Sequence, residues 1–532
     1  MQDYDDRDHS PRDTRDDWAE LELVYAEPRS EDTVQALVTE VLGEGLPVAA
    51  VFDPQSDHHF FLTLVGLLRM SEEEAVFALA REYRPVLQAD EINPALIGGL
   101  YFQRAGVAPG LLANLCSTPE VPLSPTGWPH QMVGTKGGWN TQKAPKGRGG
   151  IVAVIDTGHS SHDELTGSIL THGQLNLVEG GTDARDRFNA GIGKNAGHGT
   201  LVCSVLASRG DIDSGFNMTA PGKITGVAPA ADVLPIRAFR SVMNLSQRTI
   251  PRAISHATRH DARVITMAMG APYRISATEK AMRQAVDEGV LLVCAAGNCW
   301  PWTVFPAAYA PLNLCSAAGA VRQDKSAWPN SSRGPETTIS APGENVWGAT
   351  KPAASSPDDA VKPAQGTTLA TAMTSGAAIL WSTAIGSRDD LKNLAKKNGM
   401  TGQQLFNRIL QQTAERPANW PPNYGLGAGI LRIDRMFQAV TSGGNVARTD
   451  AGDPGPDIDL ALAPWGTVRT IDIVRMLFRA RAPEIEAELG EEMADYAPEI
   501  LWRAQIRGSG RSIDGVPPWL RDRPLLRSYL TQ

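Results

Sequence analysis

The chain has little cysteine, few aromatic residues and no long apolar run. Its 532 residues include five cysteines, and 6% are Phe, Trp or Tyr. So few cysteines, odd in number and mostly in apolar segments, do not suit a disulfide-stabilised secreted domain, so we expect reduced and buried thiols. No histidine completes a zinc site around Cys294 and Cys299. The five are Cys116, Cys203, Cys294, Cys299 and Cys315.

Patterns typical of membrane and targeting segments are also missing. No run of eighteen apolar residues predicts a transmembrane helix, and the first residues lack the apolar core of a secretory signal. The formal charge is −9, from 50 Lys and Arg against 59 Asp and Glu, without a basic patch. We therefore expect a cytoplasmic protein of two or three domains that contacts neither membrane nor nucleic acid.

Two apolar segments lead into polar residues that are typical of catalytic sites. Residues 151–155 precede Asp156, and residues 293–296 lead through Gly297 into Asn298. Each run predicts a buried parallel strand. Open α/β sheets place their ligand crevice at the carboxyl ends of such strands, so Asp156 and Asn298 are candidate site residues.

Two further segments predict helices that open on polar side chains. His198 begins a run of small and apolar residues that reaches Ala207. Thr368 lies in residues 366–370 (Gly-Thr-Thr-Leu-Ala), ahead of a second such run. Ser375 lies about two turns into this second helix, where we expect buried packing and not a nucleophile.

Together and in this order, the four segments resemble the motifs of the subtilisin-like serine proteases, the subtilase or peptidase S8 family. The resemblance spans roughly residues 122–440. It implies an α/β catalytic domain, a parallel sheet with helices on both faces, that hydrolyses peptide bonds of peptide or protein substrates without a cofactor. Weaker matches lie at 226–229, 264–272, 305–308, 331–335 and 341–343.

The resemblance assigns a role to each polar residue. Asp156 would orient the imidazole of His198, which would act as general base. Asn298 would donate its side-chain amide to the oxyanion, beside a backbone N–H at the start of the Thr368 helix. Without the resemblance, Asp156 and Asn298 are also typical turn residues, and His198 is also a locally bonded helix start. The expected walls of the substrate groove are Ala268, Met269, Gly270, Ala296 and Gly297.

Thr368 departs from the family, which has serine at the nucleophile position. Threonine keeps a hydroxyl but adds a methyl group that restricts χ1. An internal threonine also lacks the terminal amine that serves as base in threonine hydrolases. Three interpretations stay open: an adapted endopeptidase, an attenuated one, and an inactive peptide-binding relative, whether natural or engineered. Ala372 in place of proline and Leu201 in place of histidine remove no catalytic group.

The region before the motifs predicts a separate α+β domain behind a polar tail. Its order, βαββαβ, is ferredoxin-like and similar to the subtilase propeptide, which implies a folding chaperone and inhibitor. An unrelated α+β domain is the alternative. Strand patterns lie at 21–25, 48–52, 60–65 and 86–89, and helix patterns at 34–42 and 71–80, the second opening on a capping box.

After residue 440 the composition shifts to Gly, Asp and Pro, which is typical of a linker. Helix patterns at 471–481 and 485–497 then predict a helical C-terminal extension. The extension packs on the catalytic domain, binds a protein partner or itself, or is disordered. The expected divisions are a disordered tail 1–18, a propeptide-like domain 19–105, a linker 106–125, the catalytic domain 126–440, a linker 441–465 and the extension 466–532.

Structural calcium occurs in many subtilases, and two carboxylates precede the His198 helix. Asp183 and Asp186 do not have the spacing of a known calcium loop. We therefore expect solvated loop carboxylates and no metal site. His159 and His162, just after Asp156, are expected to support their loop.

Overall fold

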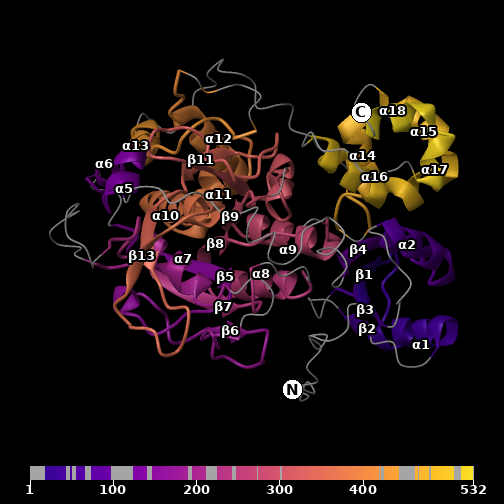
Figure 1. Cartoon of the computed structure of the whole chain (residues 1–532), viewed down its shortest axis with the longest axis horizontal. Helices are drawn as coiled ribbons and strands as arrows, with labels where there is room; N and C mark the ends of the chain where they lie inside the picture. Colours follow the sequence, from indigo (N-terminus) through magenta and orange to yellow (C-terminus); the bar gives the residue numbers. More distant parts are fainter. Residues whose placement is uncertain are drawn as a thin grey trace.

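The fold comprises three units that lie side by side (Figure 1). We call them the N-terminal unit (within 18–97), the central unit (within 124–441) and the C-terminal unit (within 462–530). The expected tail up to residue 17, Cys116 and most of both expected linkers lie outside the described residues. The structure, a computed structural model, describes residues 18–43, 48–50, 56–65, 74–97, 124–140, 146–189, 195–210, 224–242, 247–271, 273–299, 302–418, 420, 425–441, 462–464, 466–478, 481–508 and 517–530.

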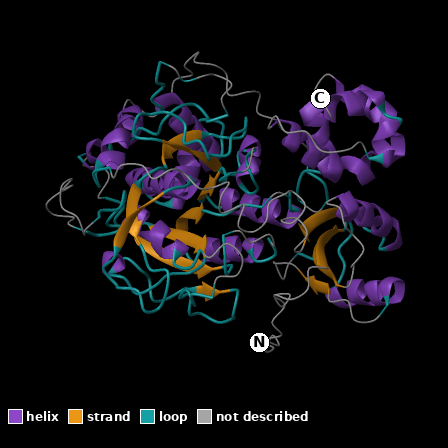
Figure 2. Ribbon diagram, in the orientation of Figure 1, coloured by secondary structure: helices purple, strands orange, loops and turns teal. Residues whose placement is uncertain are grey.

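A seven-stranded parallel sheet in the order β11-β10-β9-β8-β5-β7-β6 organises the central unit (Figure 2). The expected parallel α/β sheet is therefore confirmed. All carboxyl ends meet at one edge, so Asp156 and Asn298 are brought to the same side. The strands are β5 (Ile151–Asp156), β6 (Leu175–Asn176), β7 (Asp232–Arg237), β8 (Ala262–Met267), β9 (Leu291–Ala295), β10 (Ser316–Val321) and β11 (Ile339–Pro342).

Alternate residues of β5 serve two hydrophobic cores on opposite faces of the sheet. Val152 and Val154 pack with α7 (His198–Ala207) and α10 (Thr367–Ile385). Ala153 and Ile155 pack with α8 (Ile250–Arg259) and α9 (Ser276–Asp287). Both faces of a parallel strand are buried, which is why these strands read as continuous apolar runs. The remaining elements of this unit are α5 (Trp128–Val133), α6 (Thr135–Trp139), η1 (Asp163–Leu165), η2 (Ala307–Leu312), β12 (Val346–Ala349), β13 (Val361–Ala364), α11 (Arg388–Lys397), α12 (Gly402–Thr413) and α13 (Ile433–Thr441).

α10 is the core helix of this unit. By length and composition it could cross a membrane, and it is the one helix among the described residues that could. However, 83% of its apolar window is buried inside the protein. Its small and apolar side chains pack against the sheet, and Ser375 is fully buried among them, as expected.

The N-terminal unit is a four-stranded antiparallel sheet in the order β2-β3-β1-β4 with two helices. The strand expected at 86–89 is wrong: Val86 ends a helix, and the last strand is β4. A proline at 94 weakened the strand pattern, but β4 is an edge strand, where proline is tolerated. The elements are β1 (Trp18–Val24), α1 (Glu31–Leu42), β2 (Val48–Ala50), β3 (His59–Val65), α2 (Glu74–Val86) and β4 (Glu91–Ile97).

A buried carboxylate of the N-terminal unit caps a helix of the central unit. Glu22 is fully buried and accepts hydrogen bonds from the backbone N–H groups of Ser276 (2.8 Å) and Ala277 (2.7 Å). These residues begin α9, whose N-terminus has no side-chain cap of its own. The first N–H groups of a helix have no partner within the helix, so the two units are joined by the hydrogen bonds that Glu22 accepts from α9.

Replacing Glu22 by Gln is expected to change how stability depends on pH. Burial raises the pKa of Glu22 from 4.5 to about 7. The stabilisation from this group is therefore full below about pH 4.5 and is lost as the pH rises through about 7. The loss is at most on the order of 3 kcal/mol. Thermal melting at about pH 5 and pH 8 should show that the wild type loses more stability at the higher pH than Glu22→Gln does.

The variant also controls for the neighbouring titratable groups. Burial keeps the pKa of His59 well below its usual value and raises the pKa of Glu91, but both groups are present in both proteins and cancel in the comparison. A difference between wild type and variant that is equal at both pH values would contradict the prediction.

The C-terminal unit is helical, with five α-helices and one 3-10 turn among its described residues. The single helix expected over 485–497 is interrupted, because Gly490 has a φ of +56° and ends α15. Val474, Ile485 and Ile500 of this unit belong to the same core as α8 and α9. The helices are α14 (Thr470–Phe478), α15 (Ala482–Leu489), η4 (Gly490–Glu492), α16 (Met493–Gly508), α17 (Pro518–Arg521) and α18 (Pro524–Leu530).

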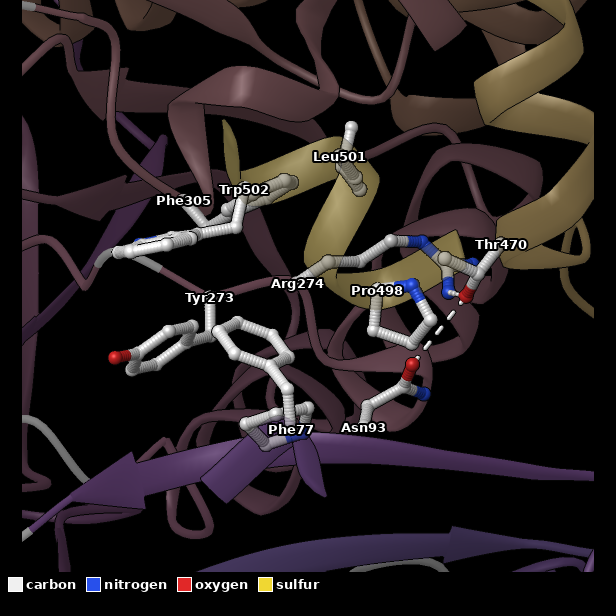
Figure 3. Close-up of a pocket in the computed structure, with 10 residues that line it drawn as sticks. Phe77, Asn93, Tyr273, Arg274, Phe305, Thr470, Pro498, Leu501 and Trp502 are labelled. Carbon is white, nitrogen blue, oxygen red and sulfur yellow. Dashed lines mark hydrogen bonds between the residues drawn. The ribbon is translucent and has the colours of Figure 1, made fainter. Parts of the chain in front are cut away.

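All three units meet at a small pocket beside Arg274 (Figure 3). The Arg274 side chain is 3% exposed and donates to Glu279 Oε2 (2.6 Å) in the central unit and to Thr470 Oγ1 (2.8 Å) in the C-terminal unit. Glu91 of the N-terminal unit accepts the Thr470 N–H (2.8 Å) and lies 3.7 Å from Arg274. Nearby, Arg81 pairs with Glu499 at 2.6 Å. The C-terminal unit thus binds the other two units at once.

One expectation about the cysteines is wrong. Cys203, Cys294 and Cys315 are free and buried, as expected. Cys299, however, is disulfide-bonded. Burial raises the pKa of Cys203 and of Cys294 above the usual thiol value, which keeps these two protonated.

Candidate active site

Asp156, His198 and Thr368 come together at the carboxyl edge of the sheet. Asp156 ends β5, and its carboxylate oxygens lie 2.8 and 3.0 Å from His198 Nδ1. His198 begins α7, and its Nε2 lies 3.2 Å from Thr368 Oγ1. The Asp156 side chain is 1% exposed and the His198 side chain 11%, so the contact that orients the imidazole ring is shielded from solvent. The order carboxylate, imidazole, hydroxyl is that of a nucleophile with an oriented base.

The start of α7 approaches the Asp156 turn closely enough to require glycine. A Cβ on Gly199 would lie 2.0 Å from the carbonyl oxygen of Gly158. This contact explains why glycine follows His198, and it holds the imidazole at the Asp156 carboxylate.

The methyl group of Thr368 does not turn its hydroxyl away from His198. Thr368 is the second residue of α10 and is 5% exposed. Threonine has few χ1 rotamers, and the one present directs Oγ1 at the imidazole. The geometry therefore provides a hydroxyl at hydrogen-bond distance from a base.

Asn298 is held with its amide N–H₂ group available. Its Oδ1 accepts from the backbone N–H of Thr367 (2.8 Å) and from the Thr367 hydroxyl (2.8 Å). A backbone N–H can only donate, so the atom that faces it is the amide oxygen and Nδ2 points the other way. The Thr367 hydroxyl also accepts from the N–H of Gly297 (3.3 Å). Thr367 thus positions the amide, a role that we did not predict, although it belongs to the same motif as Thr368.

The sequence comparisons agree with this geometry. The model of the subtilase family, Peptidase S8, matches residues 147–429, which is more than half of the chain. The chain belongs to the subtilase family. It is 32% identical over 213 residues to the major intracellular serine protease of Bacillus subtilis, covering 38% of this chain and 61% of that relative. It is 29% identical over 263 residues to subtilisin Savinase of Lederbergia lenta, covering 48% of this chain and 86% of that relative.

This subtilase also shows a distant likeness to a solved structure. Against the crystal structure of MycP1 with the N-terminal propeptide removed, the identity is 25% and the TM-score 0.44, covering 59% of this chain and 97% of that chain.

The expected groove walls follow two adjacent strands of the sheet. Residues 268–270 continue from β8, and Ala296 and Gly297 continue from β9, which pairs with β8. The side chain of Met269 is 3% exposed and packs in the core with Phe305, so it does not line a groove. Ala268 and Ala296 are also buried, whereas Gly270 and Gly297 are partly exposed, and their place in the groove wall stays a prediction.

The expectation that Asp186 is a solvated loop carboxylate is wrong. It is 5% exposed and accepts from the Thr157 hydroxyl (3.0 Å) and from the Gly197 N–H (2.7 Å). Thr157 follows Asp156 and Gly197 precedes His198, so one carboxylate joins the loops that carry both residues. The fully buried Arg237 lies 3.8 Å away and donates to the Thr157 carbonyl. Sequence separation concealed this network, because these loops meet only in the folded chain.

Asp183, by contrast, is a surface carboxylate. It pairs with Arg185 (2.7 Å) and Arg187 (2.9 Å), which lower its pKa. His162 supports its loop as expected, because its Nδ1 accepts the Glu164 N–H (3.2 Å) and its Nε2 lies 2.9 Å from the Ala360 carbonyl oxygen. Within the described ranges, no group of three His, Cys, Asp or Glu side chains is arranged to hold a metal ion.

Replacing Asp186 by Asn is expected to lower kcat by about 10- to 10²-fold while KM changes little. Both loop hydrogen bonds go to Oδ2, which the amide oxygen can replace. The amide N–H₂ group then takes the place of Oδ1, where it faces the Phe188 N–H and Arg237, which only donate, so the side chain and the two loops bonded to it shift. A displacement near 1 Å costs roughly 10²-fold in rate. Steady-state kinetics with a peptide substrate measure the effect, in the wild type or in Thr368→Ser, whichever turns over faster.

Asp183→Asn is the matched control for Asp186→Asn, since it removes a paired carboxylate three residues away on the surface. It should leave kcat unchanged. Equal kcat values for the two variants would show that Asp186 does not position the site.

Proposed function

We propose that this subtilase is an endopeptidase that hydrolyses peptide bonds through an acyl-enzyme on Thr368. The observation that carries the proposal is the 3.2 Å separation of Thr368 Oγ1 and His198 Nε2, with Asp156 behind the imidazole. His198 takes the hydroxyl proton as Oγ1 attacks the carbonyl carbon, and returns it to the leaving amine. Water then attacks the ester, again with His198 as base, and releases Thr368.

The negative charge that forms on the carbonyl oxygen is stabilised by Asn298 Nδ2 and a backbone N–H at the start of α10. The first N–H groups of a helix have no partner within the helix, so one is available to the oxyanion. Donors fixed in place before the reaction stabilise the transition state more than the ground state.

The N-terminal unit is proposed to act as a propeptide-type inhibitor of the same chain. Its docking on α9 through Glu22, and its βαββαβ order, support this role. The segment that would pass through the groove, between Ile97 and Ser124, lies outside the described residues. Partners through the C-terminal unit are less favoured, because much of its apolar surface is buried against the other two units.

The alternative is an attenuated or inactive subtilase that binds peptides, with the methyl group of Thr368 blocking attack. The Oγ1–Nε2 distance of 3.2 Å lies within hydrogen-bond reach and favours the active form. A cytoplasmic location remains part of the proposal. The names of two relatives include the word intracellular, whereas the disulfide at Cys299 is typical of an oxidising compartment.

Intact mass over time, for the wild type, Thr368→Ser and Thr368→Ala purified in parallel, tests the proposal. An active endopeptidase should cut its own chain within residues 98–123 in the first two proteins and not in Thr368→Ala. Cleavage by Thr368→Ser alone would show that threonine silences a competent site. Cleavage at the same rate in all three would exclude Thr368 as the nucleophile, and an intact chain in all three would favour the peptide-binding alternative.

A further inference from the structure

The two walls of the groove are joined by a short segment that crosses between them. The N–H of Val304 donates to the carbonyl of Ala296 (2.9 Å), on the β9 side. Phe305 exchanges two backbone hydrogen bonds of 2.9 Å with Ala271, on the β8 side. Residues 304–305 are therefore bonded to both walls and form the floor between them.

The side chain of Val304 fills the space between the two walls. It is 1% exposed. A Cβ placed on Gly270 would lie 2.1 Å from Val304 Cγ2, and a Cβ placed on Gly297 would lie 3.0 and 3.2 Å from its two methyl carbons. A Cβ on Gly270 would therefore overlap the isopropyl group and a Cβ on Gly297 would press against it, so glycine on both walls leaves room for Val304.

This space lies where a substrate side chain would enter. Gly297 precedes Asn298, the proposed oxyanion donor, and is held by Thr367, the neighbour of Thr368. The carbonyl that is attacked must lie between Asn298 and Thr368. The side chain of the same substrate residue, called P1, then points into the gap between Gly297 and Gly270, above Val304.

We propose that Val304 makes this site selective for peptides with a small P1 residue, namely glycine, alanine or serine. The inference rests on the proposed function and adds the substrate class. A leucine or phenylalanine side chain would have to displace a valine that is packed against both walls. Since one methylene in a hydrophobic pocket changes kcat/KM by about 10- to 200-fold, the discrimination against phenylalanine should reach at least about 10²-fold.

Peptides that differ only at P1 test the proposal in the full chain. We expect kcat/KM for alanine to exceed that for phenylalanine by at least about 10²-fold in the wild type, or in Thr368→Ser if the wild type is slow. Val304→Ala and then Val304→Gly should raise the ratio of the phenylalanine value to the alanine value stepwise, by about 10-fold or more. Val290→Ala removes an equally buried valine just before β9, at the far end of the sheet, and should leave the ratio unchanged.

The outcomes separate this inference from the proposed function. A wild type that prefers leucine or phenylalanine, or a P1 ratio that is the same in Val304→Ala, overturns the role of Val304 while the peptidase stands. If neither the wild type nor Thr368→Ser cleaves any peptide, hydrolysis is overturned. Binding of the same fluorescent peptides to Thr368→Ala, with and without Val304→Ala, then tests the small P1 pocket. Equal affinity of Thr368→Ala for the alanine and phenylalanine peptides would refute the role of Val304.

Discussion

Replacing Thr368 by Ser is expected to raise kcat for peptide hydrolysis by up to about 10²-fold, and replacing it by Ala to abolish acyl-enzyme formation. In the wild type, the hydroxyl is 3.2 Å from the imidazole. The methyl group on the same carbon restricts χ1 and is expected to crowd an incoming carbonyl. Serine keeps the hydroxyl and removes the methyl group, so Oγ can align with both His198 and the substrate. Small errors in this alignment have a large cost in rate.

Thr368→Ala removes the only proposed nucleophile and leaves the oxyanion donors. Residual acceleration of about 10³- to 10⁴-fold over water is typical when a member of such a triad is lost. The measurement is pre-steady-state and steady-state hydrolysis of one chromogenic peptide by the three proteins. A burst of product in the wild type and in Thr368→Ser, absent from Thr368→Ala, would identify the acyl-enzyme.

Circular dichroism of all three proteins is the control for folding, because position 368 is 5% exposed within the core helix. A wild-type rate equal to that of Thr368→Ala, with Thr368→Ser far above both, would contradict an active threonine. It would leave peptide binding as the function of the natural chain.

Replacing Arg274 by Met is expected to loosen both outer units from the central unit. The guanidinium is buried between Glu279, Glu91 and Thr470, each from a different unit. Glu279 keeps its ion pair with Arg283 (2.8 Å), but the largely buried Glu91 loses its charged partner, and breaking a buried ion pair typically costs about 3–5 kcal/mol. Burial already raises the pKa of Glu91, so without Arg274 its ionised form becomes still less favourable. Methionine retains most of the volume, which limits the effect to the lost charge and the lost hydrogen bonds to Glu279 and Thr470.

Hydrogen exchange followed by mass spectrometry measures this effect locally. Amide protection should fall in β4 and α14 of Arg274→Met and remain in β5 and α10, which belong to the core of the central unit. Arg185→Met is the matched control, since Arg185 also pairs with a carboxylate but its side chain is 63% exposed. Unchanged protection of β4 and α14 would show that the ionic contacts do not hold the units together.

The sequence by itself determined the family, the parallel sheet and the residues that meet at its edge. Asp156, His198, Asn298 and Thr368 lie in short segments where residue identity and apolar pattern occur together, and strand ends in a parallel sheet converge without further information. Local patterns suffice where the chemistry of a site depends on residues next to regular elements.

The tertiary structure alone decided what depends on contacts between distant segments. The sequence around Asp186 is typical of a surface loop, but in the folded chain its carboxylate is bonded to the loops of Asp156 and His198. Residues 91–97 form strand β4 because they pair with β1, which is distant in sequence. Val304 belongs to no recognisable motif. The small P1 pocket is inferred only from its contacts with Gly270 and Gly297 in the folded chain. Burial and hydrogen-bond partners are properties of the folded chain, because each is set by residues that are far away in sequence.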